Sequence, residues 1–176
     1  MNKSSSILFY IIVTILCLAY VGFNFYDSNF GKKAEELENF KIDELTEYEI
    51  LNKELSSGRF SSTKYTNGTS TGAPSATKFE DSDNVEISYK EYVGISRISA
   101  TKAKNTVLSL NIESELLSGV GKLVVICDDE ILEYIDFNET RTLVYEVRGE
   151  HIYSVKMMCE DAQVKVKVSR SFEPLP

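Results

Sequence analysis

The chain has 176 residues, with 27 acidic against 19 basic side chains and a formal net charge of −8. Nucleic-acid binding requires a basic face for the phosphates, so this charge argues against a nucleic-acid partner. The length suits one folded domain with additional segments. The sequence has no Trp and one His.

The first organised feature is an apolar run that follows a short polar head, residues 1–6. The run contains no charged residue from Ile7 to Tyr26. This length is at the lower end for a membrane-spanning helix, and its tyrosines suit the membrane interface. We expect residues 7–26 to form a signal-anchor that spans the membrane once, with the head in the cytoplasm and the C-terminal part outside.

A cleaved signal peptide is the alternative interpretation of this segment. Lys3 supplies a weak positive region before the apolar run, and cleavage after Ala19 would place Cys17 at the −3 position. Such cleavage predicts a secreted domain. The apolar run continues past that site through Val21 and Phe23, which favours retention of the anchor.

Residues 32–56 combine many charged residues with apolar residues at helical spacing. This pattern predicts an amphipathic helix next to the membrane. Its apolar stripe offers either a docking surface for a protein partner or a face that packs on the chain's own domain. The residues that we assign to docking are Leu37, Phe40, Tyr48, Leu51 and Leu55.

Residues 57–80 have a different composition, dominated by Ser, Thr and Gly. A segment with so few large apolar side chains cannot offset its ordering entropy by burial. We therefore expect a flexible linker here.

Residues 81–176 contain short runs in which apolar and polar residues alternate, which is typical of strands with one buried face. Leu123 to Cys127 is apolar at every position and predicts a central strand buried on both faces. Acidic, Asn and Gly turns separate the runs. The fold class that we predict is mainly β: an antiparallel β-sandwich of jelly-roll or Ig-like type.

The cysteines of this domain, Cys127 and Cys159, end strands that we expect to run in opposite directions. Their Cα atoms would then lie too far apart for a disulfide. We predict two free, largely buried thiols.

No residue pattern in the chain indicates a catalytic centre, a cofactor or a metal site. His151 has no nucleophile motif beside it. The acidic turns Asp128-Asp129-Glu130 and Asp81/Asp83 match no calcium loop and are interpreted as solvated turns. We therefore expect a non-enzymatic protein.

The organisation of the chain favours an extracytoplasmic interaction module, an accessory subunit that binds a protein partner in the membrane or envelope. The alternative function is a cell-surface protein that binds carbohydrate or cell wall. Tyr92 and Tyr134 are the tyrosines that alternation does not assign to the core, and they are the candidate glycan contacts.

Overall fold

The computed structural model describes residues 32–66, 69–71, 78–80 and 83–176. The expected head and signal-anchor, residues 1–26, lie outside these residues. No helix in the described part of the chain is long and apolar enough to cross a membrane. The chain divides into two compact units, residues 1–39 and 40–176. Helix α2 (Lys32–Glu38) belongs to the first unit, and all other described elements belong to the second.

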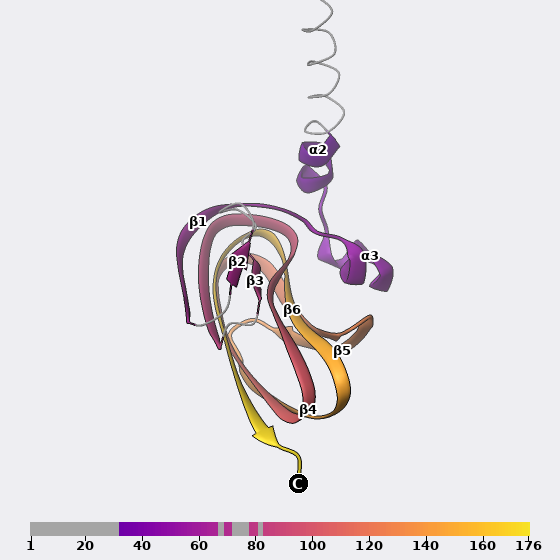
Figure 1. Ribbon diagram of the computed structural model, residues 1–176. Coiled ribbons are helices and arrows are strands. Elements are labelled where there is room, and N and C mark those ends of the chain that lie inside the picture. The colour runs from indigo at the N-terminus through magenta and orange to yellow at the C-terminus, as the bar shows by residue number, and fades with distance from the viewer. Residues whose placement is uncertain (1–31, 67–68, 72–77, 81–82) are drawn as a thin grey trace, which may run out of the picture. The chain divides into compact units, whose positions relative to one another are not determined.

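The second unit begins with two short helical segments and continues as a β-sheet (Figure 1). In chain order its elements are η2 (Ile42–Glu44), α3 (Glu47–Asn52), β1 (Leu55–Thr66), β2 (Thr69–Thr71), β3 (Lys78–Glu80), β4 (Asn84–Cys127), β5 (Glu130–Asp136) and β6 (Thr140–Pro174). Pairing is antiparallel throughout except between β3 and β4. The prediction of a mainly β, antiparallel fold is confirmed.

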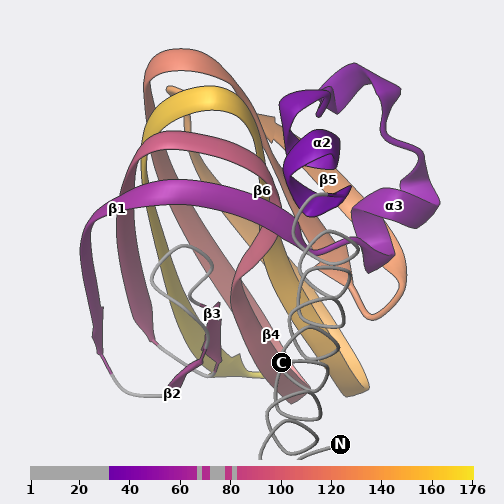
Figure 2. The same ribbon diagram turned by 90° about the horizontal axis from the view of Figure 1, so that it is seen from above.

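The long strands β4 and β6 form a two-stranded ribbon that folds back on itself. In the ribbon, residues 84–104 pair with 150–169, 106–113 with 140–147, and 122–127 with 130–136 of β5. Residues 106–127 pair in addition with 153–174, so β6 has β4 on both of its edges. The strands curve together around one interior (Figure 2).

The ribbon turns at Asn105 and Gly149, which lie opposite each other. Both have positive φ, 48° and 93°. The Asn105 Oδ1 atom accepts a hydrogen bond of 2.9 Å from the Gly149 amide. This contact joins the two bends, so both strands of the ribbon change direction together.

The interior is filled by the side chains that the alternation assigned to it. Val85, Ile87 and Tyr89 are at most 1% exposed. The same cluster contains the alternating apolar residues of the later runs, among them Leu108, Leu110, Ile112, Val155, Met157, Val164, Val166 and Val168. Residues 123–126 are buried at every position and pair with β5 on one edge and β6 on the other. The predicted central strand is therefore confirmed.

The single amphipathic helix expected over residues 32–56 is wrong. The chain is helical only in α2, η2 and α3, and extended backbone at Lys41 (φ −132°, ψ 129°) and Leu45 (φ −71°, ψ 128°) separates the helical segments. Thr46 starts α3 with a capping box shared with Glu49. Leu55 is no longer helical and begins β1.

The flexible linker expected over residues 57–80 is also wrong for its first part. Strand β1 pairs with β4 from Leu55 opposite Ile95 to Thr66 opposite Asn84. Main-chain hydrogen bonds hold this strand, and they do not depend on large side chains. Gly58 allows close contact: a Cβ atom there would lie 2.8 Å from the ring of Tyr92. The domain therefore includes residues before 81, because the compact unit begins at Phe40.

Candidate functional site

Residues 40–54 cover part of the outer face of the sheet, the face opposite the main core. Phe40 and Ile50 are buried there against Val124, Ile126 and Met158. Leu45 at the end of η2 and Leu51 of α3 pack around them. This contact explains why residues 123–126 are apolar on both faces: one face lines the interior, and the other is covered by residues of η2 and α3.

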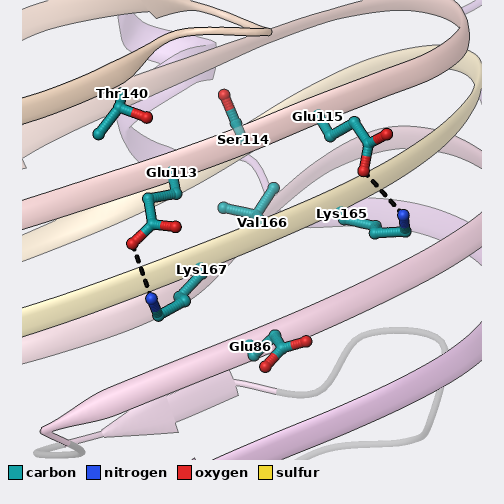
Figure 3. A pocket seen from close by; sticks show the side chains of 8 residues that line it. All are labelled: Glu86, Glu113, Ser114, Glu115, Thr140, Lys165, Val166 and Lys167. Carbon is teal, nitrogen blue, oxygen red and sulfur yellow. Dashed lines mark hydrogen bonds and ion pairs between the residues drawn. The ribbon is translucent and has the colours of Figure 1, made fainter.

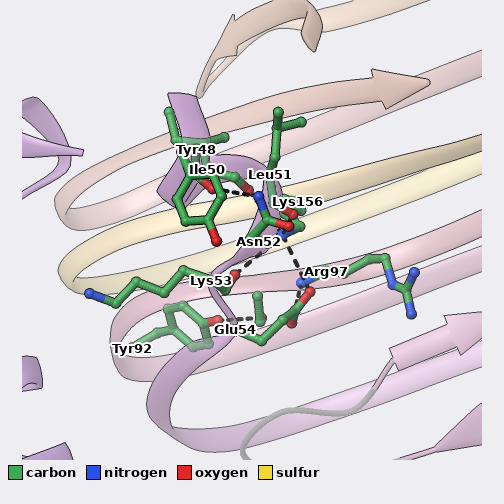
Figure 4. Close-up of polar contacts among 10 residues, drawn as sticks. Tyr48, Ile50, Leu51, Asn52, Lys53, Glu54, Tyr92, Arg97 and Lys156 are labelled. Carbon is green, nitrogen blue, oxygen red and sulfur yellow. Dashed lines mark hydrogen bonds and ion pairs between the residues drawn. The ribbon is translucent and has the colours of Figure 1, made fainter. Parts of the chain in front are cut away.

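Lys156 fixes the end of α3 to the sheet. Its side chain is 5% exposed, and Nζ donates hydrogen bonds to the carbonyl oxygens of Ile50 at 2.9 Å, Leu51 at 2.8 Å and Lys53 at 3.2 Å (Figure 4). The carboxylate of Glu54 lies 3.5 Å from the same Nζ. Carbonyls at the C-terminal end of a helix lack intrahelical donors and carry partial negative charge. The buried ammonium of Lys156 gives these carbonyls the hydrogen-bond donors that they lack, and its positive charge compensates their partial negative charge.

The beginning of this covering segment is fixed by Glu160 of β6. Its carboxylate accepts hydrogen bonds from Lys41 Nζ at 2.8 Å and from the Ile42 amide at 2.7 Å. Burial alone would raise the pKa of Glu160, but these two donors outweigh it and the pKa is lowered. Residues 40–54 are thus attached to the sheet at both ends.

Most of the predicted docking residues are part of this fold and not of an exposed stripe. Phe40 and Leu55 are buried in the domain, and Leu51 is half-buried against Phe40, Ile50 and the outer face of the sheet. Leu37 is half-buried in α2. Tyr48 differs from these, because 75% of its surface is exposed.

Strand β5, which α3 contacts, also carries exposed apolar side chains. Tyr134 is 44% exposed and Leu132 is 36% exposed. Partial burial, and then the charge of Glu47 on α3, raise the pKa of Tyr134. Lys122 Nζ lies 5.8 Å from the centre of the Tyr134 ring. We call Tyr48, Leu132 and Tyr134 the α3 face.

The other predicted glycan contact, Tyr92, is fully buried, so this prediction is wrong for that residue. Its ring lies 4.8 Å from that of Tyr89, and its hydroxyl forms a hydrogen bond with Ser96. Burial raises the pKa of the Tyr92 hydroxyl far above its usual range. The positive φ of Glu91 interrupts the alternation and directs Tyr92 inward.

A polar hollow of about 430 Å³ lies on the outer face of β4 and β6. Its charged groups form cross-strand pairs, Glu113 with Lys167 and Glu115 with Lys165, each at 2.7 Å (Figure 3). The hydrogen bond from Lys167 lowers the pKa of Glu113. No aromatic side chain lines the hollow, and ligand pockets of this size are mostly apolar. We therefore interpret it as a charged outer surface.

The two cysteines of the described residues, Cys127 and Cys159, are free, as predicted. Cys159 pairs with Gly121 and Cys127 with Tyr153, so the two thiols stand at well-separated positions along the same strand pair. Cys159 is fully buried, and burial raises its pKa strongly. Cys127 is half-buried, and burial raises its pKa as well.

His151 lies against the turn that follows Cys127. Its Nδ1 atom is 2.8 Å from Asp128 Oδ2, and its Nε2 atom is 3.2 Å from the Arg148 carbonyl oxygen. The contact with Asp128, and then that with Arg148, raise the pKa of His151. The hydrogen bond from the Ile152 amide, and then the contact with His151, lower the pKa of Asp128. Sequence reasoning missed this group because its members lie on different strands. Of the other predicted turn residues, Asp83 pairs with Arg170 at 3.4 Å, and Asp81 lies outside the described residues.

Comparisons with known proteins give no family. No protein-family model matches the chain, and no curated protein matches it. Among solved structures the chain is similar to the secreted serine protease VesC from Vibrio cholerae, with a TM-score of 0.37 and 10% sequence identity. This similarity covers 52% of the chain and 21% of the VesC chain, and it carries no conclusion about fold or function.

Proposed function

We propose that this protein is a membrane-anchored interaction module outside the cytoplasm, a non-enzymatic accessory subunit that binds a protein partner in the membrane or envelope. The observation that carries the proposal is the α3 face. Its tyrosines, Tyr48 and Tyr134, expose 75% and 44% of their surface on elements that the fold holds in place.

The composition of the α3 face suits binding to a protein. Tyrosine supplies a large contact area at low conformational-entropy cost and is enriched among the residues that dominate protein interfaces. Charged groups lie close by, with Glu47 on α3 and Lys122 over the ring of Tyr134. An apolar centre with a polar rim is the usual arrangement of such interfaces.

The support beneath the α3 face favours a preformed surface. Lys156 holds the C-terminal end of α3, the capping box of Thr46 and Glu49 orders its start, and Glu160 holds the chain at Lys41. A surface that is ordered before binding loses less entropy when a partner arrives.

The proposal also includes a membrane anchor over residues 7–26 and a β-sandwich fold. The uncharged run from Ile7 to Tyr26 supports retention in the membrane. A ribbon of two long strands that folds back on itself supports a jelly-roll type of β-sandwich. The carbohydrate-binding alternative is weakened, because Tyr92, one of its two candidate glycan contacts, is buried. Secretion after cleavage near Ala19 would leave the α3 face intact.

Cross-linking in intact membranes, followed by mass spectrometry, tests this function. The wild-type chain is compared with the double variant Tyr48→Ser/Tyr134→Ser and with Val144→Ser, which changes an exposed residue on β6. We expect one protein captured by the wild type and by Val144→Ser and lost in the double variant. Equal capture by all three chains would contradict a role of the α3 face.

A further inference from the structure

Three different metal-binding side chains meet where the turn after β4 lies against β6. One ligand atom each from Cys127, Asp128 and His151 lie within 4.8 Å of one another. Tetrahedral ligands of an ion bound at about 2.0–2.3 Å stand roughly 3.3–3.8 Å from one another, so the most distant of these donor atoms would have to approach by about 1 Å. A small movement of exposed or half-buried side chains therefore brings all three donors to one ion.

The backbone orients the carboxylate and the imidazole. Asp128 has a φ of 51°, and its Oδ1 atom accepts a hydrogen bond of 2.9 Å from the Ile152 amide. The Asp128 amide in turn donates to the Ile152 carbonyl at 2.8 Å. These contacts leave Oδ2 directed at His151, so both side chains are already ordered before an ion binds.

The tautomer of His151 also suits a ligand. A carbonyl oxygen only accepts hydrogen bonds, so the contact with Arg148 places a hydrogen on Nε2. Histidines that bind metals commonly donate their second ring N–H to a carbonyl or carboxylate, which fixes the ring. The remaining nitrogen, Nδ1, is the one that faces Asp128.

We propose that Cys127, Asp128 and His151 bind one borderline divalent transition-metal ion of the Zn²⁺ type. The donor set of one sulfur, one nitrogen and one oxygen atom favours this class over Ca²⁺ and Mg²⁺, which prefer oxygen ligands only. Three protein ligands leave a fourth position for water. Asp129 and Glu130, the other acidic residues of the turn, are not members of the group.

Binding of the metal ion changes only the protonation of its ligands. The ion takes the place of the proton between Nδ1 of His151 and Oδ2 of Asp128, and the thiol of Cys127 loses its proton to become a thiolate ligand. Both protons pass to the solvent. No oxidation or reduction occurs.

Metal titration of the full-length, reduced and metal-free protein in detergent tests the site. Zn²⁺ is followed by calorimetry, and Co²⁺ by absorption, because a thiolate bound to Co²⁺ gives a sulfur-to-metal charge-transfer band. We expect one ion per chain with this band. Cys127→Ser should abolish the band, and His151→Ala should weaken binding by at least about tenfold. Asp129→Asn is the matched control for Asp128→Asn and should bind as the wild type does.

Zn²⁺ should also raise the Tm of the wild-type protein, because an ion that binds the folded state stabilises it. This measurement needs no variant, so it remains informative if a substitution prevents folding. The proposal is overturned if Co²⁺ binds without a thiolate band, if Zn²⁺ leaves the Tm of the wild type unchanged, or if Asp129→Asn weakens binding as much as Asp128→Asn does.

Discussion

The ammonium of Lys156 donates a 2.9 Å hydrogen bond to the carbonyl oxygen of Ile50, a residue 106 positions earlier in the chain. This bond joins the middle of β6 to the last turn of α3. The α3 face is presented by elements that this contact positions, so the buried lysine supports the surface that we propose for binding.

Lys156→Met should lower the free energy of unfolding by about 2–3 kcal/mol, because it removes a charged donor from three carbonyls. Lys165→Met is the matched control on the same strand. Lys165 is 53% exposed and pairs with Glu115, so we expect a change below about 1 kcal/mol. Urea unfolding followed by circular dichroism measures both values. Equal effects would show that the contacts of Lys156 contribute no more than a surface ion pair.

Gly94→Ala should destabilise the protein more than Gly149→Ala does. Both glycines have positive φ, 112° and 93°, where an L-residue is strained by about 1–2 kcal/mol. At position 94 the new Cβ atom would in addition lie 2.0 Å from the Leu55 carbonyl oxygen, so β1 would have to move. At position 149 the nearest atom is 3.6 Å away. Thermal unfolding of the two variants decides the order.

Glu160 should make the attachment of residues 40–54 sensitive to acid. Its pKa is lowered in the folded protein. Its stabilising contribution is therefore complete above the unfolded pKa of about 4.3 and is lost as the pH falls through the lower folded value. The protection of residues 40–54 against hydrogen exchange, measured relative to the intrinsic exchange rate at each pH, should fall in this range. Glu160→Gln should show faster exchange already at neutral pH and a weaker acid dependence, whereas an unchanged profile would contradict this role.

Cys127 should react with an alkylating reagent before Cys159 does. Cys159 is fully buried, with a strongly raised pKa, whereas Cys127 is half-buried. Peptide mapping by mass spectrometry after timed alkylation gives both rates. We expect Cys159 to react only on unfolding. A disulfide between the two cysteines after mild oxidation would be incompatible with their positions along the strands.

The sequence pattern was sufficient for the core of the sheet, because burial of one face leaves a period of two that is visible in runs such as Val164, Val166 and Val168. It was insufficient for β1, since an edge strand held by main-chain hydrogen bonds shows no apolar pattern. The helical spacing of apolar residues in 32–56 led to the wrong prediction of one continuous helix. Phe40 and Leu55 match the stripe, but both lie outside the helices and are buried in the domain.

The alternation of apolar and polar residues could not predict the polar contacts of Lys156 or the proximity of Cys127 and His151. Lys156 alternates with apolar residues and therefore indicates a solvent-facing position, yet it is buried because α3 covers that part of the sheet. Cys127 and His151 come together only through the register that places Cys127 opposite Tyr153. The Asp128-Asp129 turn sets the pairing of β4 with β5 and not that of β4 with β6, so no local sequence signal would have brought the two residues together.

Site-specific photo-cross-linking in intact cells tests the central claim most directly. A benzophenone amino acid replaces Tyr48 in one chain and Phe172, an equally aromatic and 43% exposed residue of β6, in another. The account predicts a discrete covalent adduct with a single membrane or envelope protein from position 48 and none from position 172. Absence of an adduct at position 48, or the same adducts from both positions, would contradict binding through the α3 face.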